Sequence, residues 1–240
     1  MSLQNHRAVI VGGTSGIGLA VAKSFLAQGA QVIVASRSQE KVDVAMKELG
    51  TAHGYVLDFQ DESQTKQFFE NIVTFDHLVV TASGGAAREP FDALSIDDAK
   101  AAFASKFWGQ YVTVKAALPY IKKSGSITLT SGAYAARPLK GASTMVAINS
   151  AIEGLARVLA MDLAPIRVNV VSPGVVDTPV FSGMDTESRE AMFQRAAQSL
   201  LLKRIAKPEE IAEAYVYLAN NSYTTGSVIQ IEGGAILTGI

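Results

Sequence analysis

The strongest constraint on the fold of this chain is an alternation of apolar runs and helical patterns that begins at a glycine-rich turn. Residues 8–11 form a continuous apolar run, residues 12–18 form the turn, and residues 19–26 carry apolar side chains at helical spacing. Short apolar runs and helical segments then alternate along the rest of the chain. Strands that are apolar throughout are typical of a parallel sheet whose two faces are covered by helices.

We therefore predict one α/β domain over residues 1–240, with a doubly wound parallel sheet of the Rossmann type. No linker, internal repeat or low-complexity segment interrupts the pattern. Strands are predicted at residues 8–11, 31–35, 54–57, 77–81, 127–130, 167–171 and 228–231. Helices are predicted from the glycine turn to Gly29, at 39–49, 62–72, from a cap at Ser95 to near Pro119, at 145–163, and from Pro208.

The composition excludes several classes of protein. Hydrophobic residues make up 48% of the chain, and 21 Lys and Arg nearly cancel 22 Asp and Glu. A disordered chain is therefore excluded, and bulk electrostatic binding to nucleic acid or to an acidic membrane is disfavoured. The apolar run near the N-terminus breaks at Gly12, far short of the roughly 18 residues that a membrane span needs. We expect a cytoplasmic protein.

Metal binding is not expected either. The chain has no cysteine, which excludes disulfides and thiolate metal sites. Its three histidines, His6, His53 and His77, are scattered and form no ligand pair at helical or turn spacing. We therefore predict no metal site.

The glycine turn has the spacing Gly12-x-x-x-Gly16-x-Gly18. The first glycine permits a tight exit from the strand, and the other two allow the backbone to approach a pyrophosphate at the helix N-terminus. Glycine turns are common in α/β proteins, but this one follows the first strand of a repeating pattern, as the motif requires. It predicts a dinucleotide-binding site.

The residues after the second predicted strand indicate which dinucleotide is bound. An acid there would accept a hydrogen bond from a ribose 2′-hydroxyl, but the chain has Ser36-Arg37-Ser38. Arg37 can bind a 2′-phosphate with two hydrogen bonds, and both serines can donate as well. The alternative is that Arg37 is a solvated surface residue. We predict NADP rather than NAD.

These motifs together resemble the short-chain dehydrogenase/reductase family, and the resemblance spans nearly all of the chain. The glycine turn matches the family pattern TGxxxGxG, with Val11 in place of the threonine. Asp58 resembles the residue that contacts adenine. Residues 80–83 stand where the family has NNAG, and only Ala82 is retained.

Further along, Pro173-Gly174 with Thr178 resembles the PGxxxT segment that holds the nicotinamide amide, and residues 225–234 resemble the C-terminal strand and loop. The glycine turn, the residues after the second strand and these matches together imply the following cofactor-binding residues: Gly12, Thr14, Ser15, Gly16, Ile17, Gly18, Ser36, Arg37, Ser38, Asp58, Phe59, Ala82, Ser83, Asn149, Pro173, Gly174, Val176 and Thr178.

The same resemblance raises a question about catalysis. The family uses an Asn-Ser-Tyr-Lys tetrad, in which the tyrosine donates a proton to the substrate carbonyl. Ser131 matches the family serine, and residues 153–155 help to align the YxxxK pair with Met145 and Asn149. The family asparagine falls on Lys106. A thioether cannot supply a proton, so the usual acid is missing.

Three interpretations stay open. The protein is a catalytically silent NADP(H) sensor, or it carries out non-redox chemistry on this scaffold, or the acid role has moved. In the last case Lys106 brings an ammonium group into the vacated space, Ser131 holds the substrate oxygen, and Asn149 takes over the ribose contact. Tyr134 is a second candidate donor, or an aromatic residue that packs in the loop over the pocket.

A substrate lid is expected at about residues 178–205, by resemblance to the family. Its Phe and Met side chains favour a small, largely apolar substrate, although an ordinary amphipathic helix has the same composition. The predicted helices near residues 101–118 and 145–163 are apolar on more than one face, which indicates burial beyond one subunit. The family commonly forms dimers and tetramers through these helices, so we expect a homo-oligomer.

Overall fold

The computed structural model describes residues 2–84 and 88–238 of the chain. Seven parallel strands form one sheet in the order β3-β2-β1-β4-β5-β6-β7. Strands β2 and β3 lie on one side of β1 and strands β4 to β7 on the other, so the order of strand addition reverses between β1 and β4. This confirms the predicted fold class. The strands are β1 (Arg7–Val11), β2 (Gln31–Ser36), β3 (His53–Val56), β4 (Phe75–Val80), β5 (Ile121–Thr130), β6 (Arg167–Pro173) and β7 (Val228–Ile231).

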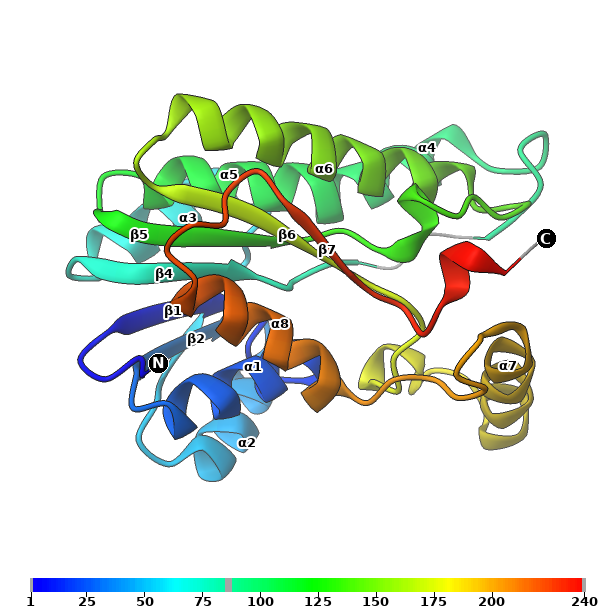
Figure 1. The fold of residues 1–240 in the computed structure, drawn as a ribbon, viewed down its shortest axis with the longest axis horizontal. Helices are drawn as coiled ribbons and strands as arrows, with labels where there is room; N and C mark the ends of the chain where they lie inside the picture. Colours follow the sequence, from blue (N-terminus) through cyan, green and yellow to red (C-terminus); the bar gives the residue numbers. More distant parts are fainter. Residues whose placement is uncertain (1, 85–87, 239–240) are drawn as a thin grey trace.

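Helices cover both faces of the sheet (Figure 1). The α-helices are α1 (Gly16–Ala27), α2 (Gln39–Leu49), α3 (Glu62–Glu70), α4 (Ile96–Phe103), α5 (Gly109–Ala117), α6 (Ser143–Asp162), α7 (Thr186–Ser199) and α8 (Pro208–Asn220). Helices α1, α2 and α8 pack on one face, around buried residues such as Phe25 and Tyr215. Helices α3, α5 and α6 pack on the other face, around residues such as Phe69 and Ile152.

Helix α6 is unusual in this chain for its length and apolar composition. Helix α6 is long and apolar enough to meet a length-and-composition test for a membrane span. Its residues Ile148 and Ile152 are fully buried in the core against the sheet, and α6 contacts β6. One face of α6 is therefore packed in the core of this domain.

The structure corrects two predicted elements. Strand β5 begins at Ile121 rather than at residue 127, because residues 122–124 are polar and exposed and interrupt the apolar pattern. The predicted helix from Ser95 to Pro119 is interrupted by a π-helical turn, η1 (Ala104–Trp108), between α4 and α5. A π-helical turn accommodates an extra residue and is frequently found at functional sites.

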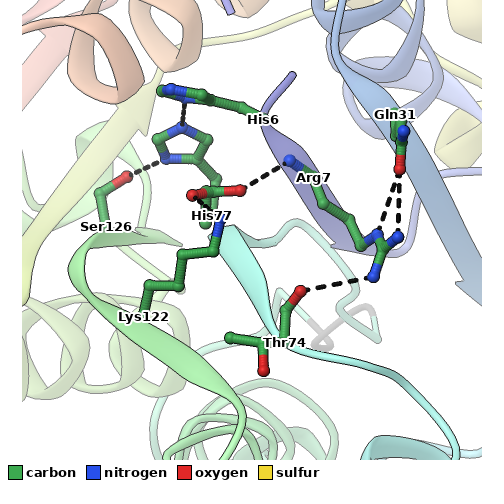
Figure 2. A network of polar contacts seen from close by, with 8 residues as sticks. His6, Arg7, Gln31, Thr74, His77, Lys122 and Ser126 are labelled. Atoms are coloured by element: carbon green, nitrogen blue, oxygen red, sulfur yellow. Dashed lines mark hydrogen bonds and ion pairs between the residues drawn. The ribbon is translucent and has the colours of Figure 1, made fainter. Parts of the chain in front are cut away.

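A polar network lies among the first residues of β1 and β4 and along β5 (Figure 2). His6 Nδ1 is 2.9 Å from His77 Nε2, and His77 Nδ1 is 2.8 Å from the Ser126 hydroxyl. Burial lowers the pKa of His77 to about 4, and the nearby His6 acts in the same direction. The pairing of β1 with β4 brings together two histidines that are 71 positions apart, which spacing along the chain did not indicate.

Asp76 is the acidic member of this region. Its carboxylate accepts hydrogen bonds from the Arg7 backbone N–H at 2.9 Å and from Lys122 Nζ at 2.8 Å. Desolvation opposes ionisation of Asp76, but the hydrogen bonds from Lys122 and Arg7 outweigh it and leave the pKa below its ordinary value. Within residues 2–84 and 88–238, no group of three His, Asp or Glu side chains is arranged to hold a metal ion.

Candidate active site

The glycine turn between β1 and α1 has a backbone that only glycine can adopt. Gly12 has a φ of +92°, and a Cβ atom there would lie 2.5 Å from the Ala82 nitrogen. A Cβ atom on Gly18 would overlap the carbonyl oxygen of Gly12. Ser15 precedes α1 without capping it, and the first turn of α1 contains no acid. The turn therefore leaves a shallow cradle in front of a helix N-terminus, which fits a pyrophosphate.

Segments far apart in the chain converge on this cradle. The Thr81 hydroxyl, just after β4, donates to the carbonyl oxygens of Val11 and Gly12, each at 3.3 Å. Thr178 lies against Gly16, where a Cβ atom on the glycine would be 3.1 Å from both Cβ and Cγ2 of the threonine. The carboxyl ends of β1, β4 and β6 thus surround one site, at the point where a doubly wound sheet binds its ligand. The residues present fit a dinucleotide.

The residues that were predicted to select the cofactor lie beside this cradle, after β2. Arg37 is exposed and makes no hydrogen bond or ion pair with any residue that the structure describes, whereas Ser36 and Ser38 are half-buried. The Ser38 hydroxyl accepts a hydrogen bond from the Lys41 backbone N–H at 3.3 Å and so caps α2. Asp58 Oδ1 accepts from the Gln60 N–H at 3.1 Å.

Some predicted cofactor contacts serve mainly the core. Phe59 and Val176 are buried, and the Phe59 ring packs against Gly109 on α5. Gly174 donates its N–H to the Ile231 carbonyl and joins the end of β6 to β7. The remaining predicted residues also lie at the strand ends and around the turn: Thr14 is buried, Ile17 and Ala82 are half-buried against the core, Pro173 is half-buried, and Ser83 is exposed.

The candidate catalytic residues meet where η1 faces α6. Lys106 lies in the π-helical turn, and its side chain is buried. Its Nζ donates to Asn149 Oδ1 at 2.8 Å and to the Ser131 carbonyl oxygen at 2.8 Å, and lies 3.8 Å from the Met145 sulfur. Lys106 therefore contacts each of the other three residues that the resemblance placed at the tetrad positions.

Burial controls the charge of this lysine. Desolvation disfavours the ammonium form and lowers the pKa of Lys106 to about 8. No carboxylate within the described residues forms an ion pair with it. Lys106 is therefore an acid that can give up a proton much nearer neutrality than an exposed lysine can.

The Ser131 hydroxyl is directed differently from the expectation. It donates to Glu153 Oε1 at 3.0 Å, and the contact between Ser131 and Lys106 is made by the carbonyl oxygen. Glu153 in turn lies 3.9 Å from the guanidinium of Arg157. Sequence reasoning missed Glu153 as a site residue, although it stands four residues after Asn149 and so lies on the same face of α6.

Tyr134 lies apart from this group of contacts. It is half-buried in the short 3₁₀ turn η2 (Ala133–Ala135), and its hydroxyl bonds to no residue that the structure describes. The segment expected to form the lid contains the turn η3 (Pro179–Phe181) and helix α7. Phe181 and Phe193 pack edge to face there, with ring centroids 5.4 Å apart, and no residue of α7 is fully buried.

The parallel sheet, the glycine cradle at its switch point and the polar cluster beside it define a dinucleotide-binding α/β protein. Residues 11–235 match the family model described as enoyl-(acyl carrier protein) reductase. The chain is 35% identical to the short-chain dehydrogenase/reductase ATR9 of Stachybotrys chlorohalonatus, over 98% of this chain and 99% of the relative. It is 32% identical to the 3-oxoacyl-[acyl-carrier-protein] reductase FabG of Thermotoga maritima, over 99% and 100% of the two chains. The chain belongs to the short-chain dehydrogenase/reductase family, a class of NAD(P)-dependent oxidoreductases.

Solved structures agree with this assignment. A small-chain dehydrogenase crystallised in complex with NADPH is 38% identical, with a TM-score of 0.86 over 97% of this chain and 99% of that one. The MalC reductase/Diels-Alderase of Malbranchea aurantiaca is 31% identical, with a TM-score of 0.91 over 98% of both chains.

Proposed function

We propose that this protein is an NADP(H)-dependent oxidoreductase that interconverts a small carbonyl compound and its alcohol with Lys106 as the acid. The observation that carries the proposal is the buried Lys106 ammonium, which Asn149 Oδ1 and the Ser131 carbonyl hold beside Met145. The nicotinamide, when bound, supplies or accepts the hydride. Glycine-lined backbone, Thr178 and Arg37 are the groups that bind and orient the cofactor.

The proposal explains why two residues of the tetrad differ together. The family has asparagine where this chain has Lys106, and lysine where it has Asn149. By the resemblance the two residue types have changed places, and a hydrogen bond of 2.8 Å joins them in this chain. Met145, which the resemblance aligns with the family tyrosine, has its sulfur 3.8 Å from the ammonium.

Lys106 can act in two ways on a substrate oxygen. A buried ammonium group stabilises the negative charge that develops on a carbonyl oxygen during reduction. Its lowered pKa also allows it to transfer a proton to the resulting alkoxide near neutral pH. Asn149 and the Ser131 carbonyl orient the Nζ atom for either role.

Arg37 supports NADP(H) as the cofactor. It is exposed beside the cradle, and nothing among the described residues neutralises it, so its guanidinium is available to a 2′-phosphate. A structural neighbour of 38% identity was crystallised with NADPH, which supports the same choice. No acidic residue takes this place in the chain.

For the substrate, we propose a small, largely apolar molecule beneath a lid at about residues 178–205. Phe181 and Phe193 supply the apolar surface of that segment. We also propose a homo-oligomer, since Trp108 of η1 and Val158 and Met161 of α6 are large apolar side chains that the single chain leaves exposed. The cytoplasm is the location that we propose for it.

Two alternatives rest on specific observations. Met145 stands at the position of the usual proton donor, which favours a catalytically silent NADP(H) sensor. One neighbour is both a reductase and a Diels-Alderase, which favours non-redox chemistry on this scaffold.

The test begins with fluorescence titration of the purified protein by NADPH and NADH. A preference for NADH would overturn the role of Arg37. A panel of aldehydes, ketones and diketones is then screened for NADPH consumption, with wild type and Lys106→Ala side by side. Turnover that is lost in Lys106→Ala supports the proposal, whereas an unchanged kcat refutes the acid role. Binding of NADPH without turnover favours the sensor, and product formation without NADPH consumption favours non-redox chemistry.

A further inference from the structure

A short chain of contacts links Lys106 to the carboxylate of Glu153, which has no role in the proposed reaction. Lys106 Nζ donates to the Ser131 carbonyl oxygen at 2.8 Å, and the Ser131 hydroxyl donates to Glu153 Oε1 at 3.0 Å. One residue, Ser131, thus contacts the ammonium through its backbone and the carboxylate through its side chain. Glu153 is largely buried, with 12% of its side chain exposed.

The other charged groups near η1 are poorly placed to balance the ammonium. Asp97 and Asp98 lie in the first turn of α4, where they are exposed, and Lys115 of α5 is exposed as well. Arg157 of α6 is 59% exposed and 3.9 Å from Glu153, so water screens much of its effect on that carboxylate. The residues of β5 just before Ser131 have no acidic or basic side chain.

We propose that Glu153 is a positioning residue for Lys106, acting through Ser131. Its carboxylate fixes the Ser131 side chain, which holds the carbonyl acceptor in place, and its negative charge favours the ammonium form of Lys106 without a direct ion pair. The electrostatic part of this inference concerns only the free protein; its catalytic consequence rests on the proposed function.

The two parts of the role can be separated by substitution. Glu153→Gln retains an oxygen that accepts the Ser131 hydrogen bond but removes the negative charge. Glu153→Ala removes both. A purely structural role for Glu153 therefore predicts that the glutamine variant behaves like wild type, whereas the proposed role predicts that it does not.

The primary measurement needs no substrate. Protein labelled with ¹³C at lysine Cε is titrated by NMR, and the Lys106 signal is assigned by its loss in Lys106→Met. In Glu153→Gln we expect the Lys106 midpoint to fall by about one pKa unit, because a carboxylate near a poorly solvated ammonium stabilises its charge. Glu213→Gln is the matched control, because Glu213 is an exposed residue of α8 that forms no ion pair with any residue that the structure describes. It is expected to leave the Lys106 midpoint unchanged.

An unchanged Lys106 midpoint in Glu153→Gln overturns the proposal, whatever the activity of the protein. If Glu153→Ala fails to fold, the glutamine variant alone decides the question. With a carbonyl substrate from the panel, Glu153→Gln is expected to move the alkaline limb of kcat to lower pH by the same amount, with KM little changed. A shifted NMR midpoint without any turnover supports the role of Glu153 while the proposed reductase function fails, so the two outcomes are distinguishable.

Discussion

Lys106 Nζ and Asn149 Oδ1 share a hydrogen bond of 2.8 Å, formed by residues that are 43 positions apart in the chain. The bond joins the π-helical turn η1 to α6, and it pairs a donor that cannot accept with an amide oxygen that can only accept. This polarity means that neither residue can be changed independently of the other.

Asn149→Lys alone should destabilise the protein strongly. It restores the family residue but places a second ammonium beside Lys106 in a buried site, at an expected cost of about 2–4 kcal/mol. The double variant Lys106→Asn/Asn149→Lys re-creates a complementary pair and should recover most of that loss. Urea unfolding of Lys106→Asn, Asn149→Lys and the double variant measures the coupling free energy between the two positions.

Asn71→Lys is the control for the swap, because Asn71 is an exposed residue at the end of α3. It should change the free energy of unfolding by about 0.5 kcal/mol or less. Strictly additive effects of the Lys106 and Asn149 substitutions would contradict the structural pairing.

Reduction should slow as the pH rises above about 8. Lys106 is protonated below its pKa of about 8 and is then competent as an acid, whereas above that value it loses the proton that it has to donate. The kcat for NADPH consumption, measured from about pH 6 to about pH 10, is expected to be flat on the acid side and to fall on the alkaline side. A Lys106→Met variant with the same alkaline limb would assign that limb to another group.

Arg37→Ala should weaken NADPH binding about 10- to 100-fold, because the variant loses charged hydrogen bonds to the 2′-phosphate. NADH lacks that phosphate, so its affinity should change little. Lys47→Ala, which removes an exposed cation from α2, controls for a general loss of positive charge. Equal losses for the two cofactors would exclude a phosphate contact.

Gly18→Ala should abolish binding of both cofactors. The new methyl group would overlap the Gly12 carbonyl oxygen, so the turn has to move and the cradle is lost. Gly154→Ala is the matched control, because a Cβ atom there meets nothing within 4 Å and lies in the middle of α6. That control should bind NADPH normally and gain up to about 1 kcal/mol in stability from its helix propensity. Calorimetric titration with NADPH gives the comparison, and wild-type affinity in Gly18→Ala would refute it.

Stability should fall in mild acid because of His77. Its pKa is about 4 in the folded protein against 6.5 for an unperturbed histidine, so the unfolded chain takes up its proton first. The free energy of unfolding therefore declines as the pH drops from about 6.5 to about 4, by at most about 3 kcal/mol from this residue. Above about pH 6.5 the contribution is constant.

Urea unfolding at several pH values tests this slope. His77→Gln should be less stable at neutral pH, since it disturbs the contacts with His6 and Ser126, but its stability should depend less on pH in mild acid. His53→Gln, at an exposed histidine of β3, should keep the wild-type slope. The same slope in His77→Gln as in wild type would assign the acid sensitivity elsewhere.

Much of the fold could be predicted because it depends on local patterns. Strand β7 has the predicted bounds, and the strand before the glycine turn differs by one residue, because a run of apolar residues in a buried parallel strand has few alternatives. The start of β5 could not be predicted in this way. Lys122 and Lys123 are exposed there, and only the pairing of Ile121 with Phe75 places them in a strand.

The candidate site could likewise be predicted only in part. Its four tetrad positions came from matching motifs, and the structure brings those residues into contact. The π-helical turn had no sequence signal, because it depends on backbone hydrogen bonds that have no characteristic residue pattern. Glu153 had a signal in its helical spacing from Asn149, but its contact with Ser131 also depends on how α6 packs against the end of β5.

The extra residue of η1 also affects which side chains of this helix face the end of β5. Lys106 holds the Ser131 carbonyl, while Gln110, one turn later, makes two hydrogen bonds of 3.0 Å with the backbone of Thr130. Deleting Phe107 or Trp108, which lie between Lys106 and Gln110, would turn η1 into a regular α-helix. Because the π-helical turn absorbs the extra residue locally, α4 and α5 would keep nearly the same rotation relative to each other. Homologous chains that lack this residue should therefore keep both flanking helices and differ mainly in the side chain that reaches the end of β5 from the position of Lys106.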